Sequence, residues 1–279
     1  MVNRQAPDED GPRPSPPWRS VSFTSGKRDF VLDLPWTNAS GTLGFSTEAA
    51  PLIDFASLGA FITNPISLHR RMPASGPRFV YSPGGFVLHT GLPNPGLPSV
   101  VRRNRERWRA MACPVILHLI SDDARELVRM LEMLETVEEV AGVEVGVRDD
   151  DPTGAAHLIG AAASRELPVL ARLPFGARAI DARAALDAGA AGISFAPPRA
   201  VIPGPGGMSI TGRLYGPAVF PMALETIARI RADGVDAPVM AAGGVYRRRD
   251  LNAMLAAGAS AVQLDSVLWT EPEAVLAEE

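Results

Sequence analysis

The chain has 279 residues, of which 46% are hydrophobic and 6% aromatic, so it can bury one large core built mainly from aliphatic side chains. Its formal net charge of −4 gives no electrostatic reason to expect nucleic acid or an anionic membrane as a partner. A single cysteine, Cys113, rules out an internal disulfide framework, and no apolar run reaches the roughly 18 residues that span a bilayer, so we expect a cytoplasmic protein without a membrane segment.

Short β-branched runs alternate with helical patterns along most of the chain. Residues 1–20 are rich in proline and charge, and we expect a disordered leader there, followed by one domain over residues 21–279. Eight strands separated mainly by helices predict a parallel, closed sheet, which is an α/β fold of the single (β/α)8 (TIM) barrel class. The expected strands are residues 34–40, 60–66, 115–120, 143–147, 169–173, 192–196, 239–242 and 261–264.

The joints between these elements carry their own signals. Gly189 and Gly258 each end a helix before a strand, as expected for a left-handed helix cap. Asp151 followed by a proline predicts a helix start. Two segments interrupt the alternation: residues 78–96 suggest a hairpin, and residues 197–216 a Pro/Gly-rich loop. Both are expected on the rim at the C-terminal ends of the strands, where long loops usually serve binding.

Two residue types are too scarce for some barrel chemistries. Lys27 is the only lysine among 27 basic residues and precedes the expected barrel, which excludes a Schiff-base aldolase. The four histidines form no His-x-His or His-Glu-x-x-His pair, so we expect no metal centre. His118 on the third strand and His89 in the hairpin are either site residues or structural histidines. Cys113 is expected to serve packing alone.

Six short segments, in the same order over about residues 30–270, together resemble the dihydroorotate dehydrogenase family, whose members are barrels that carry FMN. The resemblance implies an FMN-dependent oxidoreductase acting on a CH–CH bond, in which the flavin takes a hydride while a protein base removes a proton. It also implies a small-molecule substrate and leaves a homo-oligomer open. The matching segments are residues 38–44, 58–63, 83–96, 215–218, 242–245 and 258–263.

The resemblance also implies a path for the cofactor. Small residues at 39–41 would lie under the flavin ring, where they let the backbone approach it. Gly243 and Gly244 would offer backbone N–H groups to the phosphate, and Ser266 a hydroxyl, although tight strand-to-helix packing is the other explanation for the glycines. The expected cofactor-binding residues are Ala39, Ser40, Gly41, Arg172, Gly243, Gly244 and Ser266, with Asn64 and Gly216 as weaker candidates.

Several positions depart from the family pattern. Asn64 and Arg172 replace two lysines that contact the flavin, and Arg172 either keeps that role or is a salt-bridged barrel residue. Gly146 and Leu88 replace two asparagines that bind the family's substrate, so dihydroorotate is not the expected substrate. Asp149 stands near the position of the family's cysteine base; it is either the general base or part of an acidic turn that caps the next helix.

The phosphate end departs as well, because Asp265 stands where the family usually has glycine. A carboxylate there repels a phosphate unless a cation intervenes. Residues 247–249 are three arginines, so either an arginine helps to bind phosphate or it pairs with Asp265 and the phosphate site is lost. The leading interpretation is an FMN-dependent oxidoreductase with an altered substrate. The alternatives are a non-catalytic paralogue that acts as a binding or assembly subunit, and a flavin-free barrel that acts on a phosphorylated metabolite.

Overall fold

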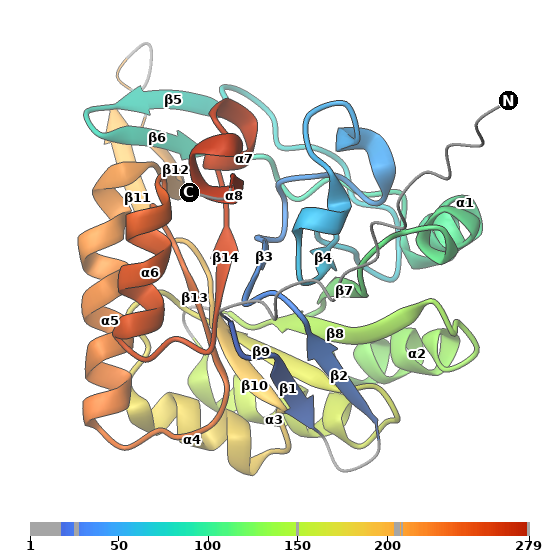
Figure 1. Cartoon of the computed structure of the whole chain (residues 1–279). Coiled ribbons are helices and arrows are strands. Elements are labelled where there is room, and N and C mark those ends of the chain that lie inside the picture. Colours follow the sequence, from blue (N-terminus) through green and yellow to red (C-terminus); the bar gives the residue numbers. More distant parts are fainter. Residues whose placement is uncertain (1–17, 25–27, 149–150, 204–206, 208, 278–279) are drawn as a thin grey trace, which may run out of the picture.

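Eight parallel strands form one closed barrel (Figure 1). The structure is a computed structural model that describes residues 18–24, 28–148, 151–203, 207 and 209–277. The strand order is β3-β14-β13-β10-β9-β8-β7-β4, and a parallel bridge between Thr37 and Ala60 joins its two ends. The predicted (β/α)8 barrel is therefore confirmed. Its strands are β3 (Trp36–Asn38), β4 (Phe61–Ile62), β7 (Val115–Ile120), β8 (Val140–Gly146), β9 (Val169–Leu173), β10 (Gly192–Phe195), β13 (Val239–Ala242) and β14 (Ala261–Leu264).

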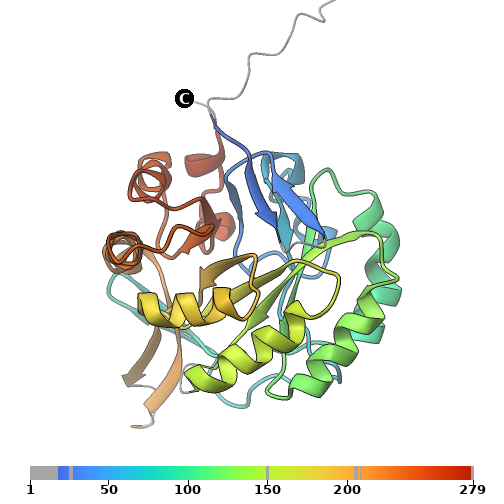
Figure 2. The same ribbon diagram turned by 90° about the horizontal axis from the view of Figure 1, so that it is seen from below.

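Helices follow the strands and surround them in chain order, as the view from below shows (Figure 2). Two positions depart from the regular pattern. After β3 the chain forms only 3₁₀ turns, at Thr47–Ala49 and Phe55–Ser57, and after β14 it forms two helices of four residues, α7 (Val267–Thr270) and α8 (Glu273–Leu276). The other helices are α1 (Leu97–Arg109), α2 (Ala124–Leu134), α3 (Pro152–Ala163), α4 (Ala179–Asp187), α5 (Phe220–Ala232) and α6 (Arg248–Ala256).

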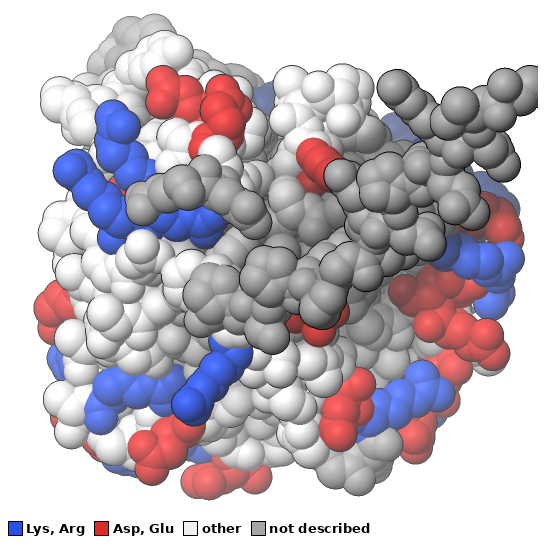
Figure 3. All heavy atoms as spheres, in the orientation of Figure 1, with Lys and Arg blue, Asp and Glu red and all other residues white. Residues whose placement is uncertain are grey.

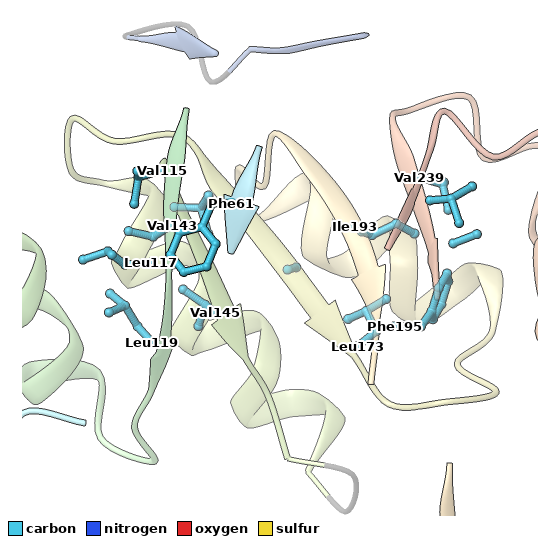
Figure 4. Packing of buried hydrophobic residues seen from close by; sticks show 14 of the residues in the cluster. Phe61, Val115, Leu117, Leu119, Val143, Val145, Leu173, Ile193, Phe195 and Val239 are labelled. Carbon is cyan, nitrogen blue, oxygen red and sulfur yellow. The ribbon is translucent and has the colours of Figure 1, made fainter. Parts of the chain in front are cut away.

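The largest hydrophobic cluster lies between the strands and these helices. Alternate residues of a strand face opposite sides, so one set of side chains points away from the barrel axis. Val115, Leu117 and Leu119 on β7 lie beside Val143 and Val145 on β8 in this layer (Figure 4). The same cluster contains the buried stripe of α2, Leu127, Met130, Leu131 and Leu134, whose spacing is that of one helix face.

The N-terminal end of the barrel is closed by a hairpin that was not predicted, β1 (Val21–Thr24) and β2 (Asp29–Leu32). Its Phe23 and Phe30 rings stack at 4.7 Å and pack against apolar residues inside the barrel. Gly142 and Gly192 make this approach possible, because a Cβ at Gly192 would lie 2.9 Å from the Phe23 ring. Ligands therefore reach the interior from the opposite end. Of the expected leader, residues 1–17 lie outside the described residues, whereas Trp18 packs edge-on against Trp36.

A four-stranded antiparallel sheet stands on the C-terminal rim. It contains the predicted hairpin, β5 (Phe79–Ser82) and β6 (Gly85–Leu88), and also β11 (Arg199–Pro203) and β12 (Ser209–Tyr215). The expectation of a loop over residues 197–216 was therefore wrong. β12 pairs with β6, and Arg213 lies opposite Leu88. The two segments are far apart in the chain, so this pairing forms only when the fold brings them together. Tertiary pairing overrides the Pro/Gly-rich composition here.

The joints agree with the sequence. Gly189 and Gly258 have φ of 103° and 105°, a conformation that suits glycine at a helix end. Asp151 caps α3 by accepting a hydrogen bond from the Gly154 N–H at 2.8 Å. On the face shown in Figure 3, basic and acidic side chains are interspersed. No helix among the described residues is long and apolar enough to cross a membrane.

Candidate active site

A cavity of about 730 Å³ opens at the C-terminal end of the barrel. Four of the predicted cofactor residues line it: Ser40 and Gly41 after β3, Asn64 after β4, and Arg172 on β9. The lining also contains His118, which the sequence left as either a site residue or a structural histidine, and Gly146 and Leu88, which stand where the family has its substrate asparagines. Tyr215, which was not predicted as a site residue, lines it as well. The predicted ring-binding residues are thus brought together at the end of the barrel where catalytic residues of this fold lie.

A buried polar cluster, centred on Glu144, lies at the bottom of this cavity. His118 Nδ1 lies 2.7 Å from Glu144 Oε1, and Arg172 Nη1 lies 3.6 Å from the same oxygen. The Ser194 hydroxyl and the Gln263 amide donate to Glu144 Oε2 at 2.6 and 2.7 Å. All five side chains are buried. We call these five residues the Glu144 cluster.

Strand parity explains part of why these residues meet. Residues of one parity on each strand face the barrel axis. His118 pairs in register with Glu144, and Arg172 with Ser194, and the contacts of Glu144 with Arg172 and Ser194 join the two pairs across the barrel interior. Leu170, two residues before Arg172, belongs to the apolar layer beneath, which packs against the N-terminal hairpin. A polar layer therefore separates the closed end of the barrel from the open one.

The cluster fixes the ionisation of its members. Burial alone would raise the pKa of Glu144, but the charge of Arg172 and hydrogen bonds from His118 and Ser194 outweigh it and lower that pKa from 4.5 to about 2. Burial lowers the pKa of His118 below its ordinary 6.5, and the attraction of Glu144 opposes this only in part. At neutral pH the pair is therefore a carboxylate beside a neutral imidazole.

The tautomer of His118 follows from this ionisation. A carboxylate can only accept hydrogen bonds, so the imidazole proton lies on Nδ1 and Nε2 carries a lone pair. No hydrogen bond among the described residues engages Nε2. A Cβ added at Gly146 would lie 3.1 Å from Nε2, so the absence of a side chain at Gly146 leaves room for the ring. Nε2 is thus a basic atom beside the cavity.

Acid should destabilise the folded protein through this pair. The pKa of His118 is lower in the folded than in the unfolded chain, so the free energy of unfolding should fall as pH drops below 6.5. The pKa of Glu144 falls from 4.5 to about 2 on folding, so about 3 kcal/mol more should be lost between these pH values. Urea unfolding at a series of pH values measures both; a free energy that is constant from neutrality to pH 4.5 would contradict the neutral, buried imidazole.

Three buried polar atoms have no hydrogen-bond partner among the described residues: Ser40 Oγ and Arg172 Nε, of residues that line the cavity, and Gln263 Oε1, of the Glu144 cluster. Buried donors and acceptors are normally satisfied, so they indicate a polar ligand. At Gly41 no atom lies within 4 Å of an added Cβ, which leaves open space beside Ser40. A flat ring with donors and acceptors on its edge, such as that of a flavin, fits these features.

The predicted phosphate end is arranged differently. Asp265 is only 4% exposed, and its carboxylate accepts hydrogen bonds from the Ser266 backbone N–H (2.5 Å) and the Ser266 hydroxyl (3.0 Å), while the backbone of Gly244 lies near enough to help lower its pKa. Burial raises the pKa of Asp265, and these hydrogen bonds oppose the rise. Gly243, Gly244 and Ser266 are absent from the cavity lining. The Ser266 hydroxyl expected to hold a phosphate therefore binds the Asp265 side chain, and this buried carboxylate does not fit beside the phosphate of FMN.

The sequence left open whether an arginine of residues 247–249 pairs with Asp265 or helps to bind phosphate, and the structure does not show the pairing. None of the three arginines at 247–249 forms an ion pair with it among the described residues; Arg248 lies over the Trp36 ring at 4.7 Å and donates to the Ala277 carbonyl. Backbone N–H groups compensate the carboxylate in place of a cation.

Packing explains the remaining glycines. A Cβ at Gly244 would lie 2.3 Å from the Phe220 backbone nitrogen, and one at Gly216 would lie 2.5 Å from the Gly85 Cα. The explanation of Gly243 and Gly244 by tight strand-to-helix packing is thus supported. Gly216 likewise lies outside the cavity lining, as does Ala39.

Two other predicted residues have different outcomes. Asp149 lies outside the described residues. Cys113 is buried, which raises its pKa to about 11 and keeps it a thiol, in agreement with a packing role.

Among the described residues no group of three or more His, Cys, Asp or Glu side chains could hold a metal ion.

Glu144, Ser194 and Gln263 were not predicted. The signal for Glu144 was present, since it is the one ionisable residue inside an otherwise apolar strand and has the same parity as Gly146. Its partners lie 26, 50 and 119 residues away in sequence, which hid the cluster.

Comparison with known proteins agrees with this architecture. The dihydroorotate dehydrogenase family model matches residues 29–148, and the nitronate monooxygenase family model matches residues 205–275. The chain is 30% identical to dihydroorotate dehydrogenase B (NAD(+)), catalytic subunit, of Geotalea uraniireducens, over 89% of this chain and 90% of that protein. It is 29% identical to the same subunit of Geotalea daltonii (86% and 85% covered) and 30% identical to that of Desulforudis audaxviator (88% and 87%). The chain belongs to the dihydroorotate dehydrogenase family of flavoprotein oxidoreductases.

Proposed function

We propose that the chain is a flavin-dependent oxidoreductase that acts on a small anionic substrate other than dihydroorotate. The observation that carries the proposal is the polar cavity over the Glu144 cluster, with its unsatisfied Ser40 Oγ, Arg172 Nε and Gln263 Oε1 beside open space at Gly41. Membership of the family supports a flavin, and the resemblance suggests FMN, although only the ring end of that cofactor has matching residues. A bound flavin supplies a hydride acceptor.

In this proposal His118 is the proton acceptor. Nε2 takes a proton from the substrate, and the ionised Glu144 stabilises the imidazolium that forms while holding the ring in place. Arg172 keeps Glu144 ionised and presents positive charge to the cavity. Asp149 remains the alternative base, as the resemblance suggested.

The lining of the cavity argues for a changed substrate. Gly146 and Leu88 offer no side-chain amide where the family binds its substrate, and each hydrogen bond left unmade in a closed site costs about 1–3 kcal/mol. Arg71, Arg199 and Arg213 add positive charge to the wall beside the rim sheet. A carboxylate-bearing substrate that does not need those amides suits this wall.

Flavin reduction tests the proposal. The purified chain, incubated with flavins and freed of excess, should be yellow, with absorption near ~450 nm. Saturated small carboxylic acids are then mixed with it without oxygen, with dihydroorotate in parallel. Bleaching by another acid and not by dihydroorotate is expected; bleaching by dihydroorotate at a rate equal to the fastest acid would overturn the changed substrate.

One observation favours a second candidate, the non-catalytic paralogue. Asp265 accepts a hydrogen bond from the Ser266 hydroxyl, which the resemblance assigns to the phosphate, so a cofactor that needs its phosphate for binding would be lost from this chain. A colourless protein that takes up neither FMN nor riboflavin would select this candidate over the enzyme.

A further inference from the structure

We propose that Asp265 permanently fills the anion-binding position of this barrel, so that the ligand of the cavity ends in a hydroxyl group rather than a phosphate. The inference rests on the proposed function for the nature of the ring: the chain should prefer riboflavin to FMN. Asp265 would then be the residue that determines this specificity.

The first support is that the donors are already used. The Ser266 backbone N–H and the Ser266 hydroxyl, after β14, both donate to one oxygen of the Asp265 carboxylate, and the backbone of Gly244, after β13, lies near enough to help lower its pKa. A phosphate would need these same donors. With Asp265 in place they have no capacity left for a second anion.

The second support is that moving the Asp265 carboxylate away from its present position would be unfavourable. Asp265 is almost fully buried, and among the described residues no cation pairs with it. Turning it away would leave a buried charge without its two hydrogen bonds from Ser266, and leaving it in place would set a dianion beside it. Both arrangements disfavour the binding of a phosphate, whereas a ligand with a neutral end incurs neither cost.

The third support is the chemistry of the surroundings. An ionised carboxylate accepts hydrogen bonds only, so a ligand hydroxyl can donate to Asp265. The Tyr246 hydroxyl lies 2.8 Å from Ser266 Oγ, which adds a second group that can bind a hydroxyl. Tyr215 lines the cavity and is close enough for the charge of Asp265 to raise its pKa, although burial is the larger cause. Asp265 therefore acts electrostatically on a residue of the cavity wall, although it does not itself line the cavity.

Ligand titrations test the inference. Quenching of flavin fluorescence gives the affinities of the wild-type chain and of Asp265→Gly for riboflavin and FMN, at about pH 8, which is well above the ordinary pKa of an aspartate side chain. The wild-type chain should bind riboflavin at least ~100-fold more tightly than FMN, and Asp265→Gly should reverse that preference. Inorganic phosphate should raise the Tm of Asp265→Gly but not that of the wild-type chain, because the freed donors can bind the phosphate oxygens.

Two further variants keep the result interpretable. Asp265→Asn removes the charge with little change in shape and should weaken the discrimination against FMN by ~10-fold or more. Asp250→Asn is the matched control: this carboxylate also accepts two backbone N–H groups, of Tyr246 and Arg247, at 3.1 and 3.0 Å, but touches neither Gly244 nor Ser266. It should leave the preference unchanged.

The outcomes separate the two proposals. FMN bound by the wild-type chain as tightly as riboflavin, or no gain of FMN or phosphate binding in either Asp265 variant, overturns the inference. If neither flavin binds to any variant but phosphate stabilises Asp265→Gly and not the wild-type chain, the role of Asp265 stands and the flavin-dependent function fails.

Discussion

Replacing Glu144 by glutamine should destabilise the folded chain by about 3–5 kcal/mol, the range seen when one member of a buried ion pair is removed. The carboxylate is the buried counter-charge of Arg172, and it accepts hydrogen bonds from Ser194 and Gln263. For a chain of this size the loss corresponds to a fall in Tm of about 10 °C. Thermal unfolding followed by circular dichroism measures it.

Glu225→Gln is the matched control for this substitution. Glu225 pairs with Arg229 at 3.2 Å on the surface of α5, with its side chain 63% exposed. Surface pairs of this kind contribute about 0–1 kcal/mol, so the same chemical change should shift Tm by only ~2 °C or less. Equal effects of the two substitutions would mean that the Glu144 cluster is not the buried, charged centre described above.

His118→Asn should slow substrate-dependent flavin reduction by about 10²–10⁴-fold, the usual contribution of a general base, while leaving flavin bound. Nε2 is the only atom of the Glu144 cluster for which the geometry gives a free lone pair beside the cavity together with a counter-charge behind it. Stopped-flow reduction at saturating substrate isolates the chemical step, and flavin fluorescence reports binding separately.

Asp149→Asn and His157→Asn complete that experiment. His157 is exposed on α3, so His157→Asn should leave the rate of flavin reduction unchanged. If Asp149→Asn abolishes reduction while His118→Asn reduces the rate less than ~10-fold, Asp149 is the base and His118 is structural. If flavin reduction is lost in His118→Asn and in neither of the other two variants, Nε2 of His118 is the atom that accepts the substrate proton.

Glu144→Gln should also change the chemistry of His118 without removing it. The introduced amide can donate to Nδ1, which moves the imidazole proton to Nε2 and removes the basic lone pair from the cavity. Reduction should therefore be lost even at a temperature where the variant is fully folded. Glu144 is a positioning residue in this account, and His118 is the group that meets the substrate.

The barrel could be predicted from the sequence because its signals are local. Runs such as residues 169–173 and 261–264 are apolar, of strand length and followed by helical patterns, and the structure has strands at these residues. The N-terminal hairpin and the pairing of β12 with β6 could not be predicted in this way. Both depend on contacts between segments far apart in the chain, which leave no periodic trace.

The site could be predicted only in part, for a similar reason. Ser40, Gly41 and Arg172 were found because a family pattern marked them, whereas Glu144, Ser194 and Gln263 meet only when residues from different strands come together in the barrel. The phosphate end shows another limit. The sequence revealed that Asp265 conflicts with a phosphate, but not that backbone N–H groups, which every residue carries, would compensate it.

The most direct test of the account is the titration of His118 by NMR, assigned by loss of its signals in His118→Asn. The central claim predicts a neutral ring with its proton on Nδ1 at neutral pH and a protonation midpoint below 6.5. A midpoint above 6.5, or a proton on Nε2 in the wild-type chain, would contradict it, because the cavity would then face a donor and not a base.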